Sequence, residues 1–326
     1  METKINPQQL KSLSVKLLNK EIVDLDAQEI INEINSCFQN LTGIYGKDVD
    51  LEHLACLPGE TGQALSLNHA AECLLDYKRT TKFLRGFVQS IKDKQKEFPQ
   101  ETIHIFYAGC GPFAPFVTMV APLFQSEEVQ FSLLEINPKS LDTAKELIQK
   151  LDLENYVQEY HLADAITFKI PNPEKYHILF SETLDALLHR ECYVPILWNL
   201  LPQVSKETTI VPENVVIKLN FKVNDEETFG ATVFDTRKVL ASTKKRNSLP
   251  EQFLSTFVSL KNADQYYSIV LDTEVQIYKD FVLTRSESSL TLALEIPIHK
   301  PIIDKGVEFT YYLKPQPSLQ FKMLAS

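Results

Sequence analysis

The chain has 326 residues, 44% of them hydrophobic and 23% charged, which is typical of a globular protein with more than one structural unit. Its net charge of −10 argues against sequence-independent binding to nucleic acid, because such binding requires a basic surface. There is no apolar run of about 18 residues and no N-terminal secretory pattern, so we expect neither a transmembrane helix nor export.

The cysteines indicate a reducing compartment. There are five of them, an odd number, and they show neither disulfide nor zinc spacing: Cys37, Cys56, Cys73, Cys110 and Cys192. We therefore expect a cytoplasmic protein without a bound metal. The basic run Lys244-Lys245-Arg246 is too short to indicate a nucleic-acid partner, and a solvated loop explains it.

Residues 1–100 are predicted to form a helical segment. Apolar residues recur at helical spacing after Pro7, up to Leu18, and a second helix is expected from about Asp26 to Asn40. After a loop at Pro58-Gly59, a long helix is expected over Leu67–Phe98, because this stretch is rich in helix formers and almost free of helix breakers.

Residues 101–204 alternate between strand and helix patterns, which predicts an α/β domain with a parallel sheet and crossover helices. Proline at the start of the second helix fits the first-turn preference of this residue. The expected strands are Ile103–Tyr107, Val129–Leu134, Tyr156–His161 and His177–Phe180, and the expected helices are Phe113–Phe124 and Pro138–Lys150.

Residues 205–326 are predicted to form an antiparallel β domain. Val215, Ile217, Leu219 and Phe221 alternate with polar residues, as in a half-buried strand. One amphipathic helix is expected to interrupt the strands, over Glu251–Leu260. Further strands are expected at Val275–Thr284, Leu290–Ile296, Val307–Leu313 and Ser318–Leu324.

A glycine turn, Gly109-Cys110-Gly111, follows the first strand of the α/β domain and is expected to open a helix. Glycine suits a backbone with positive φ, or one that a ligand approaches closely, and a helix N-terminus offers free N–H groups to that ligand. The next strand ends at Glu135, 26 residues after Gly109, where a carboxylate can accept both hydroxyls of a ribose.

These residues alone leave three interpretations of the turn open. They fit S-adenosylmethionine (SAM), but the series Gly109-x-Gly111-x-x-Ala114 also satisfies a dinucleotide pattern for NAD or FAD. A turn with only a structural role is the third interpretation. The long helical segment before the turn favours SAM, because a dinucleotide domain often begins its chain.

Two carboxylates, Glu182 and Glu191, lie nine residues apart in the loop after the fourth strand. Open α/β sheets bind their ligands beyond the carboxyl ends of the strands, so this loop is expected at a site. Paired carboxylates can grip a planar guanidinium cation and orient its nitrogen. The alternative is structural: Glu182 caps a helix and Glu191 lies on the solvated face of that helix.

Taken together, these motifs resemble the protein arginine methyltransferase family. Ser181-Glu182 and Glu191 are similar to the double-E loop of that family, and Asp76-x-x-Arg79-Thr80 is similar to its N-terminal helix motif. The segment at Val211-Pro212 is similar to the start of its β-barrel. The resemblance implies a Rossmann-like class I SAM methyltransferase domain with an N-terminal helical segment and a C-terminal antiparallel β domain.

The resemblance also implies roles for particular residues. Arg79 would bind the SAM carboxylate, Gly109 and Gly111 would form the SAM turn, and Glu135 would hold the ribose. Asp164 would lie near the adenine, and Glu182 and Glu191 would be catalytic, gripping the nitrogen of the acceptor. From the residues alone, Arg79 also has an ordinary explanation as a helix-surface arginine paired with Asp76 three positions earlier. Family members commonly form homodimers through an arm, for which Phe234–Leu260 is the candidate.

The chain departs from the family pattern at three places. Phe113 stands where the family has a third glycine, and Tyr107 where it has an aspartate. No Thr-His-Trp motif is found: the only tryptophan is Trp198, and His299 lies in Ile298-His299-Lys300. That motif helps to position a substrate arginine, so its absence makes a free small molecule at least as suitable an acceptor as a peptide.

The sequence therefore predicts a SAM-dependent N-methyltransferase that acts on a guanidino or amino group of a small molecule or peptide. One alternative is an O- or C-methyltransferase of a small molecule, in which the two glutamates are incidental or one is a base. Another is a methyltransferase-like binding protein without activity. A NAD(P) oxidoreductase remains a remote interpretation, because no hydride-transfer residues accompany the turn.

Overall fold

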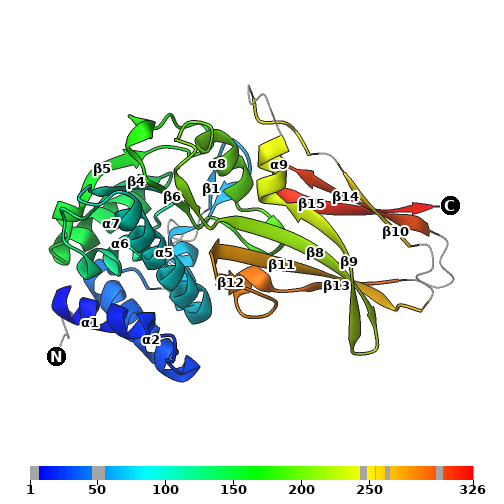
Figure 1. Cartoon of the computed structure of the whole chain (residues 1–326), viewed down its shortest axis with the longest axis horizontal. Helices are drawn as coiled ribbons and strands as arrows, with labels where there is room; N and C mark the ends of the chain where they lie inside the picture. The colour runs from blue at the N-terminus through cyan, green and yellow to red at the C-terminus, as the bar shows by residue number, and fades with distance from the viewer. Residues whose placement is uncertain are drawn as a thin grey trace.

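The structure is a computed structural model that describes residues 7–45, 56–242, 248–253, 255–260, 265–298 and 304–325. Figure 1 shows an α/β unit carrying the N-terminus and, beside it, an elongated unit of antiparallel strands carrying the C-terminus. Within the described part of the chain, no helix is both long enough and apolar enough to cross a membrane.

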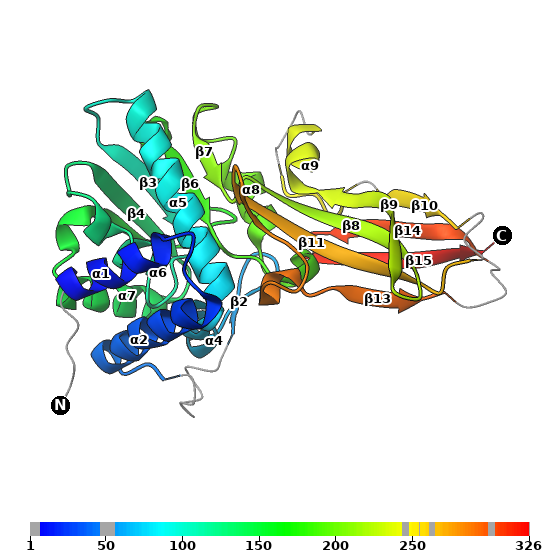
Figure 2. The same ribbon diagram turned by 60° about the horizontal axis from the view of Figure 1, so that its bottom comes forward.

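Two N-terminal helices pack on the outside of the α/β unit. They are α1 (Pro7–Leu18) and α2 (Asp24–Thr42), and both contact α5 (Tyr77–Glu97), as Figure 2 shows. Their apolar residues recur every three to four positions, so each helix buries one face. The Arg85 side chain on α5 donates hydrogen bonds to the Leu17 and Asn19 carbonyls, which stabilises the end of α1.

The prediction of one long helix over Leu67–Phe98 is wrong, because the helix is interrupted at Asp76. The structure has α4 (Leu67–Glu72), the 3-10 helix η1 (Cys73–Leu75) and then α5. Asp76 leaves the helical conformation, with φ −71° and ψ 80°, and its side chain accepts from the Arg79 N–H. Aspartate is a preferred N-cap, so Asp76 begins a new helix and places Arg79 in its first turn.

The α/β unit contains a five-stranded sheet in the order β5-β4-β3-β6-β7, and all its neighbouring strands are parallel. From β3 the chain adds β4 and β5 on one side of that strand, and it then adds β6 and β7 on the other side. The topological switch point of the sheet therefore lies between β3 and β6. The strands are β3 (Ile103–Ala108), β4 (Val129–Glu135), β5 (Val157–Leu162), β6 (Ile178–Ser181) and β7 (Thr209–Val211).

The connections of this unit agree with the predicted alternation except for one helix. The helix α7 (Pro138–Lys150) matches its prediction. The helix expected over Phe113–Phe124 is replaced by two short helices, over residues 115–118 and 121–123. Pro122 explains the break, because proline cannot continue a helix from its interior. The short elements are α6 (Pro115–Thr118), η2 (Ala121–Leu123), η3 (Glu154–Tyr156), η4 (Pro173–Lys175) and η5 (Ala186–Leu188), followed by α8 (Tyr193–Leu200).

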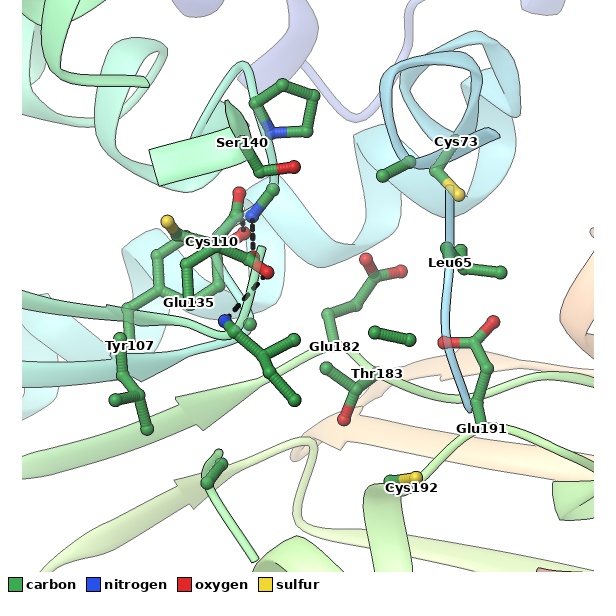
Figure 3. Close-up of a pocket in the computed structure, with 18 of the residues that line it drawn as sticks. Leu65, Cys73, Tyr107, Cys110, Glu135, Ser140, Glu182, Thr183, Glu191 and Cys192 are labelled. Carbon is green, nitrogen blue, oxygen red and sulfur yellow. Dashed lines mark hydrogen bonds between the residues drawn. The ribbon is translucent and has the colours of Figure 1, made fainter. Parts of the chain in front are cut away.

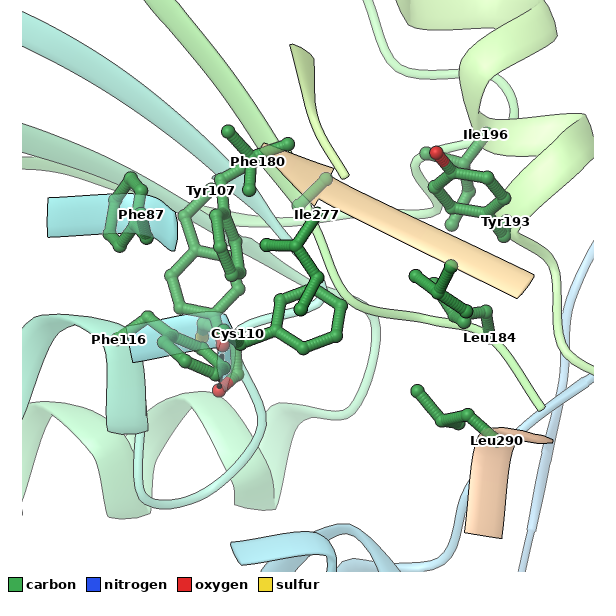
Figure 4. Packing of buried hydrophobic residues seen from close by; sticks show 14 of the residues in the cluster. Phe87, Tyr107, Cys110, Phe116, Phe180, Leu184, Tyr193, Ile196, Ile277 and Leu290 are labelled. Carbon is green, nitrogen blue, oxygen red and sulfur yellow. Dashed lines mark hydrogen bonds between the residues drawn. The ribbon is translucent and has the colours of Figure 1, made fainter. Parts of the chain in front are cut away.

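Aromatic residues fill the space between the sheet and α5 (Figure 4). The Phe180 ring of β6 lies 4.5 Å from that of Phe87, 4.7 Å from that of Phe116 and 4.8 Å from that of Tyr107, measured between centroids. All four side chains are buried. This cluster fixes the carboxyl end of β6, from which Glu182 projects.

The second unit consists of two antiparallel sheets. In the larger one the order is β12-β11-β8-β9, and β13 also pairs with β11. The smaller sheet has the order β10-β14-β15. The elements are β8 (Asn214–Val223), β9 (Glu226–Asp235), α9 (Thr236–Ser242), β10 (Thr256–Ser259), β11 (Ser268–Tyr278), β12 (Phe281–Leu283), η6 (Ser289–Thr291), β13 (Leu294–Pro297), β14 (Asp304–Tyr312) and β15 (Ser318–Ala325).

The helix expected over Glu251–Leu260 is wrong, because its described residues contain strand β10. Residues 256–259 pair with β14, and Val258 is buried while Phe257 is exposed, which is the alternation of a strand. The strand expected over Val275–Thr284 is divided into β11 and β12, and the one expected at Leu290–Ile296 begins with η6. Lys244-Lys245-Arg246 and His299 lie outside the described residues.

Candidate active site

A cavity lies beyond the carboxyl ends of β3, β4 and β6, at the switch point of the parallel sheet. It contains about 1130 Å³ of space, part of which is open to solvent. All seven site residues predicted from the sequence line it: Arg79, Gly109, Gly111, Glu135, Asp164, Glu182 and Glu191. Figure 3 shows several of them around the opening.

The glycine turn has the backbone that its sequence predicts. Gly109 has φ +77° and Gly111 has φ +65°, in the left-handed region that favours glycine. A Cβ at Gly109 would overlap the Thr183 methyl group on the neighbouring β6 loop. The turn can therefore lie against the double-carboxylate loop only because this residue has no side chain.

Glu135 holds the glycine turn and the start of α7 together. Its Oε2 accepts from the Gly111 N–H at 2.9 Å, and its Oε1 accepts from the N–H groups of Ile136 and Asn137, both at 2.9 Å. Burial raises the pKa of this carboxyl, and the three backbone donors act in the opposite direction. A carboxylate offers about four acceptor positions, so one stays available to a ligand hydroxyl.

The two departures flanking the turn are accommodated by aromatic packing. The Tyr107 hydroxyl donates to the Cys110 carbonyl at 3.4 Å, and its ring packs against Phe180. The Phe113 ring lies edge-on to Phe38 of α2, with 5.5 Å between the centroids. The N-terminal helices therefore support the glycine turn directly. No local pattern indicates this contact, because the two phenylalanines are far apart in the chain.

Arg79 is a buried member of the cavity wall, so the interpretation as a helix-surface arginine is wrong. Its side chain is 6% exposed and its Nε donates to Oε1 of Glu182 in an ion pair. Asp76 does not bind that guanidinium. Its Oδ1 accepts from the backbone N–H of Arg79, and its Oδ2 accepts from the N–H and hydroxyl of Ser289, on the β unit. Burial lowers the pKa of Arg79, but the Glu182 carboxylate outweighs it, and the net pKa is raised.

Glu182 and Glu191 both project into the cavity, Glu182 from the end of β6 and Glu191 from just before α8 (Figure 3). Burial raises the pKa of Glu182, against the opposing effect of Arg79. Burial also raises the pKa of Glu191, to about 8; Arg79 opposes the shift, while the negative charges of Asp185 and Glu182 add to it. Glu182 is thus held in an ion pair with Arg79, whereas the carboxyl group of Glu191 has a pKa near neutral.

Asp164 joins the cavity to the segment around Pro58-Gly59, which was predicted to be a loop. We call residues 57–64 the strap; it contains β1 (Leu57–Pro58) and β2 (Gln63–Ala64), which pair with each other. Oδ2 of Asp164 accepts from the Glu60 N–H of the strap at 2.7 Å. Its Oδ1 accepts from the Ile166 N–H at 2.8 Å.

The opposite side of the strap is bound to the turn between β14 and β15. The Thr61 hydroxyl donates to the Leu313 and Pro315 carbonyls, and the Gly62 N–H donates to Pro315 at 3.1 Å. The Cys192 thiol in turn donates to the Thr61 carbonyl at 3.1 Å. The strap therefore links the Asp164 end of the cavity to the Glu191 end. Its sequence signal is the pair Gly59 and Gly62.

Three cysteines also line the cavity and were not predicted as site residues. Burial raises the pKa of Cys73 to about 11 and that of Cys192 to about 12, and it raises the pKa of Cys110 as well. They are therefore neutral thiols near pH 7 and not nucleophiles. Among the residues that the structure describes, no group of three or more His, Cys, Asp or Glu is arranged to hold a metal ion.

Two solved structures that match this chain are protein arginine methyltransferases. The chain is similar to protein arginine methyltransferase 10 of Arabidopsis thaliana in an open conformation, with 12% identity and a TM-score of 0.51 over 79% of this chain and 97% of that one. It also matches a Trypanosoma brucei PRMT1 enzyme–prozyme heterotetrameric complex with AdoHcy, with 9% identity and a TM-score of 0.47 over 78% and 96%.

No protein-family model matches the sequence, and no curated protein matches it. At the identity of the Arabidopsis match, the likeness is one of fold. It confirms the predicted architecture: a Rossmann-like domain with a parallel sheet, followed by an antiparallel β domain.

Proposed function

We propose that the protein is a SAM-dependent N-methyltransferase that acts on a guanidino or amino group of a small molecule or peptide. The observation that carries this proposal is that Glu182 and Glu191 line the same cavity as the glycine turn and Glu135. A nucleotide-type subsite and a paired-carboxylate subsite are thereby adjacent, as transfer between a cofactor and a cationic acceptor requires. Fold alone does not imply this activity, so the proposal rests on the site.

The described residues fit SAM in both charge and shape. Nothing lies within 4 Å of the position that a Cβ would take at Gly111, which leaves space for a ligand, and Glu135 has one free acceptor position at the end of β4. Arg79 supplies a buried cation on the cavity wall, suited to the carboxylate of the cofactor. We assign Asp164 to the adenine end of the cavity. When bound, SAM supplies a methyl group activated by a sulfonium.

The acceptor nitrogen would lie against the two carboxylates. A cationic acceptor beside a sulfonium is repelled, by about 4 kcal/mol for unit charges about 4 Å apart at an effective dielectric of about 20. A cation bound beside Glu191 lowers the pKa of its carboxyl, so that Glu182 and the ionised Glu191 together offset this repulsion and orient the nitrogen for in-line attack. Because the pKa of Glu191 is raised to about 8, this group is also suited to accept the proton that the nitrogen must lose.

Radiolabelled SAM and a defined set of acceptors test the proposal. The acceptors are methylguanidine, L-arginine, agmatine and the tripeptides Gly-Arg-Gly and Gly-Lys-Gly. We expect Glu182→Gln and Glu191→Gln to lower turnover by at least about 100-fold, because each removes a charge used in positioning the nitrogen. Calorimetry should show SAM affinity within a few fold of wild type. Glu174→Gln, at an exposed position on η4, is the matched control.

Each alternative gives a different result. Full activity of both site variants would exclude the double-carboxylate mechanism, and a methyl group on oxygen or carbon in the product would identify an O- or C-methyltransferase. Failure to bind SAM at high micromolar concentration would support a binding protein without activity.

We further propose a cytoplasmic location and a homodimer. Cys56, Cys73, Cys110 and Cys192 are free thiols, which suits a reducing compartment. The dimer proposal comes from the resemblance alone. Within its candidate arm, Phe234–Leu260, the structure describes α9, which packs on α8 and β8. Sedimentation equilibrium of the full chain tests the dimer, and a monomer at micromolar concentration would exclude a stable one.

A further inference from the structure

The backbone between the two carboxylates adopts a conformation that its sequence does not favour. We call residues 182–191 the carboxylate loop. Within it, Leu187 has φ +57°, Leu188 has φ +52° and Arg190 has φ +75°. Side chains with a β-carbon rarely occupy this left-handed region, and leucine has no polar group that compensates locally. Such a backbone persists only where the surrounding structure imposes it.

Each of these three residues forms one backbone hydrogen bond with the β unit. The Leu187 N–H donates to Oγ1 of Thr273 on β11 at 2.8 Å. The Tyr311 hydroxyl on β14 donates to the Leu188 carbonyl at 2.9 Å. The Arg190 N–H donates to the carbonyl of Pro317, just before β15, at 2.8 Å.

The two side-chain partners have little freedom and little contact with water. Thr273 is 0% exposed and Tyr311 is 1% exposed, and Tyr311 is packed against the Phe234 ring with 4.5 Å between centroids. A hydrogen bond of this kind fixes position because neither solvent nor an alternative rotamer replaces it easily. Within the loop, the Leu188 N–H donates to the Asp185 carbonyl and the His189 N–H to the Ala186 carbonyl. The Asp185 carboxylate also accepts from backbone N–H groups of the loop, that of Glu191 among them, and lies 3.7 Å from Nε of the exposed Arg190.

We propose that Thr273 and Tyr311 are positioning residues that hold the carboxylate loop in its left-handed conformation and thereby keep Glu191 in the cavity with Glu182. This inference rests on the proposed function for its catalytic consequence. Its physical part, that the β unit imposes the loop backbone, does not depend on the reaction. The β unit thus supports the acceptor site from outside the cavity, through the backbone of the loop that carries Glu191.

Two nearly isosteric variants test the physical part. Thr273→Val and Tyr311→Phe each remove one hydrogen-bonding group while keeping the shape of the side chain. Two matched controls lose the same kind of group elsewhere: Thr208→Val, whose hydroxyl donates to the Tyr176 carbonyl at 2.8 Å, and Tyr156→Phe, whose hydroxyl donates to the Phe124 carbonyl at 2.7 Å. Thr273→Ser, which keeps the hydroxyl, should behave as wild type.

Hydrogen exchange measured by mass spectrometry reads the loop directly. In the wild type we expect slow exchange at the Leu187 and Arg190 amides, although the Arg190 residue is exposed. In Thr273→Val and Tyr311→Phe, exchange of residues 184–192 should be about fivefold faster, the effect of losing one hydrogen bond. Exchange of residues 103–112 should not change. Unprotected amides in the wild type, or equal loop exchange in variants and controls, would refute the inference even if a variant fails to fold.

Methyl transfer to the acceptor set described above tests the catalytic consequence. We expect kcat/KM for the acceptor to fall by about 10-fold to 100-fold in Thr273→Val and Tyr311→Phe, because a small displacement of Glu191 misaligns the nitrogen. SAM affinity by calorimetry should stay within twofold. An equal loss of SAM binding would indicate general disruption and refute positioning. If the wild type transfers no methyl group, the proposed function fails, while hydrogen exchange still decides whether the β unit holds the loop.

Discussion

We predict that protonation of Glu191 makes the free energy of unfolding depend on pH, and that Glu191→Gln removes this contribution. Burial, together with the charges of Asp185 and Glu182 and against that of Arg79, raises the pKa of Glu191 from an ordinary 4.5 to about 8. Between these two values the unfolded chain has lost the proton and the folded chain keeps it. The folded state therefore becomes less stable as pH rises through this window.

The expected size follows from the two pKa values. Each pH unit within the window costs about 1.4 kcal/mol, so the whole range from 4.5 to about 8 corresponds to at most about 5 kcal/mol. Glu191→Gln is neutral at every pH and does not contribute this term. Relative to the wild type, the variant should therefore gain about 3 kcal/mol in unfolding free energy between pH 5.5 and pH 7.5.

Urea unfolding at several pH values measures this difference. Trp198 is the only tryptophan, is 6% exposed and packs against Phe253 of the β unit, so its fluorescence reports the loss of the junction between the units. Titrating groups distant from Glu191 affect both proteins equally and cancel in the comparison. If the unfolding free energies of wild type and Glu191→Gln change in parallel with pH, Glu191 is ionised in the folded state and the assignment is wrong.

Two further predictions concern the supports of the cavity. Gly62→Ala should destabilise the protein by more than Gly43→Ala in urea unfolding. Both glycines have positive φ, which costs an alanine about 1–2 kcal/mol. Only at Gly62 would a Cβ also meet neighbours, 2.8 Å from Pro317 and 2.9 Å from the Arg190 carbonyl oxygen. Equal losses would show that the strap is not packed there. Phe38→Ala should cost about 3–5 kcal/mol of stability and also weaken SAM binding in calorimetry, because Phe38 supports the glycine turn through Phe113. Phe309→Ala, at a buried position in the β unit, should cost similar stability without that loss of affinity.

Much of the fold was predictable because it depends on neighbours in the chain. The α7 helix begins at Pro138 and ends at Lys150 as predicted, since its proline, its apolar spacing and its length are all local signals. Four strands of the parallel sheet were located for the same reason. The fifth, β7, was missed, because it lies in the range 205–326 that was assigned to the β domain. The glycine turn was recognisable because positive φ restricts the residue type at the position itself.

The errors occurred where distant residues decide the local structure. Residues 251–260 have an amphipathic pattern, but pairing with β14 makes residues 256–259 a strand. The helix predicted after Leu67 is interrupted at Asp76. The Asp76 carboxylate accepts from the backbone N–H of Arg79 and from the hydroxyl of Ser289, which lies on the β unit. A periodicity argument does not contain the second of these partners, which lies more than two hundred positions away.

The sequence by itself determined the types of residue at the site and the strands that carry them: a glycine turn after β3, a carboxylate after β4 and two carboxylates after β6. Only the tertiary structure decided how they are joined. The Arg79–Glu182 ion pair spans 103 positions, the Asp164–strap bond spans 104, and Tyr311 holds a loop residue 123 positions away. Backbone geometry sets local patterns through sterics, whereas burial and long-range hydrogen bonds set the charges and the loop backbone, and these exist only once the chain has folded.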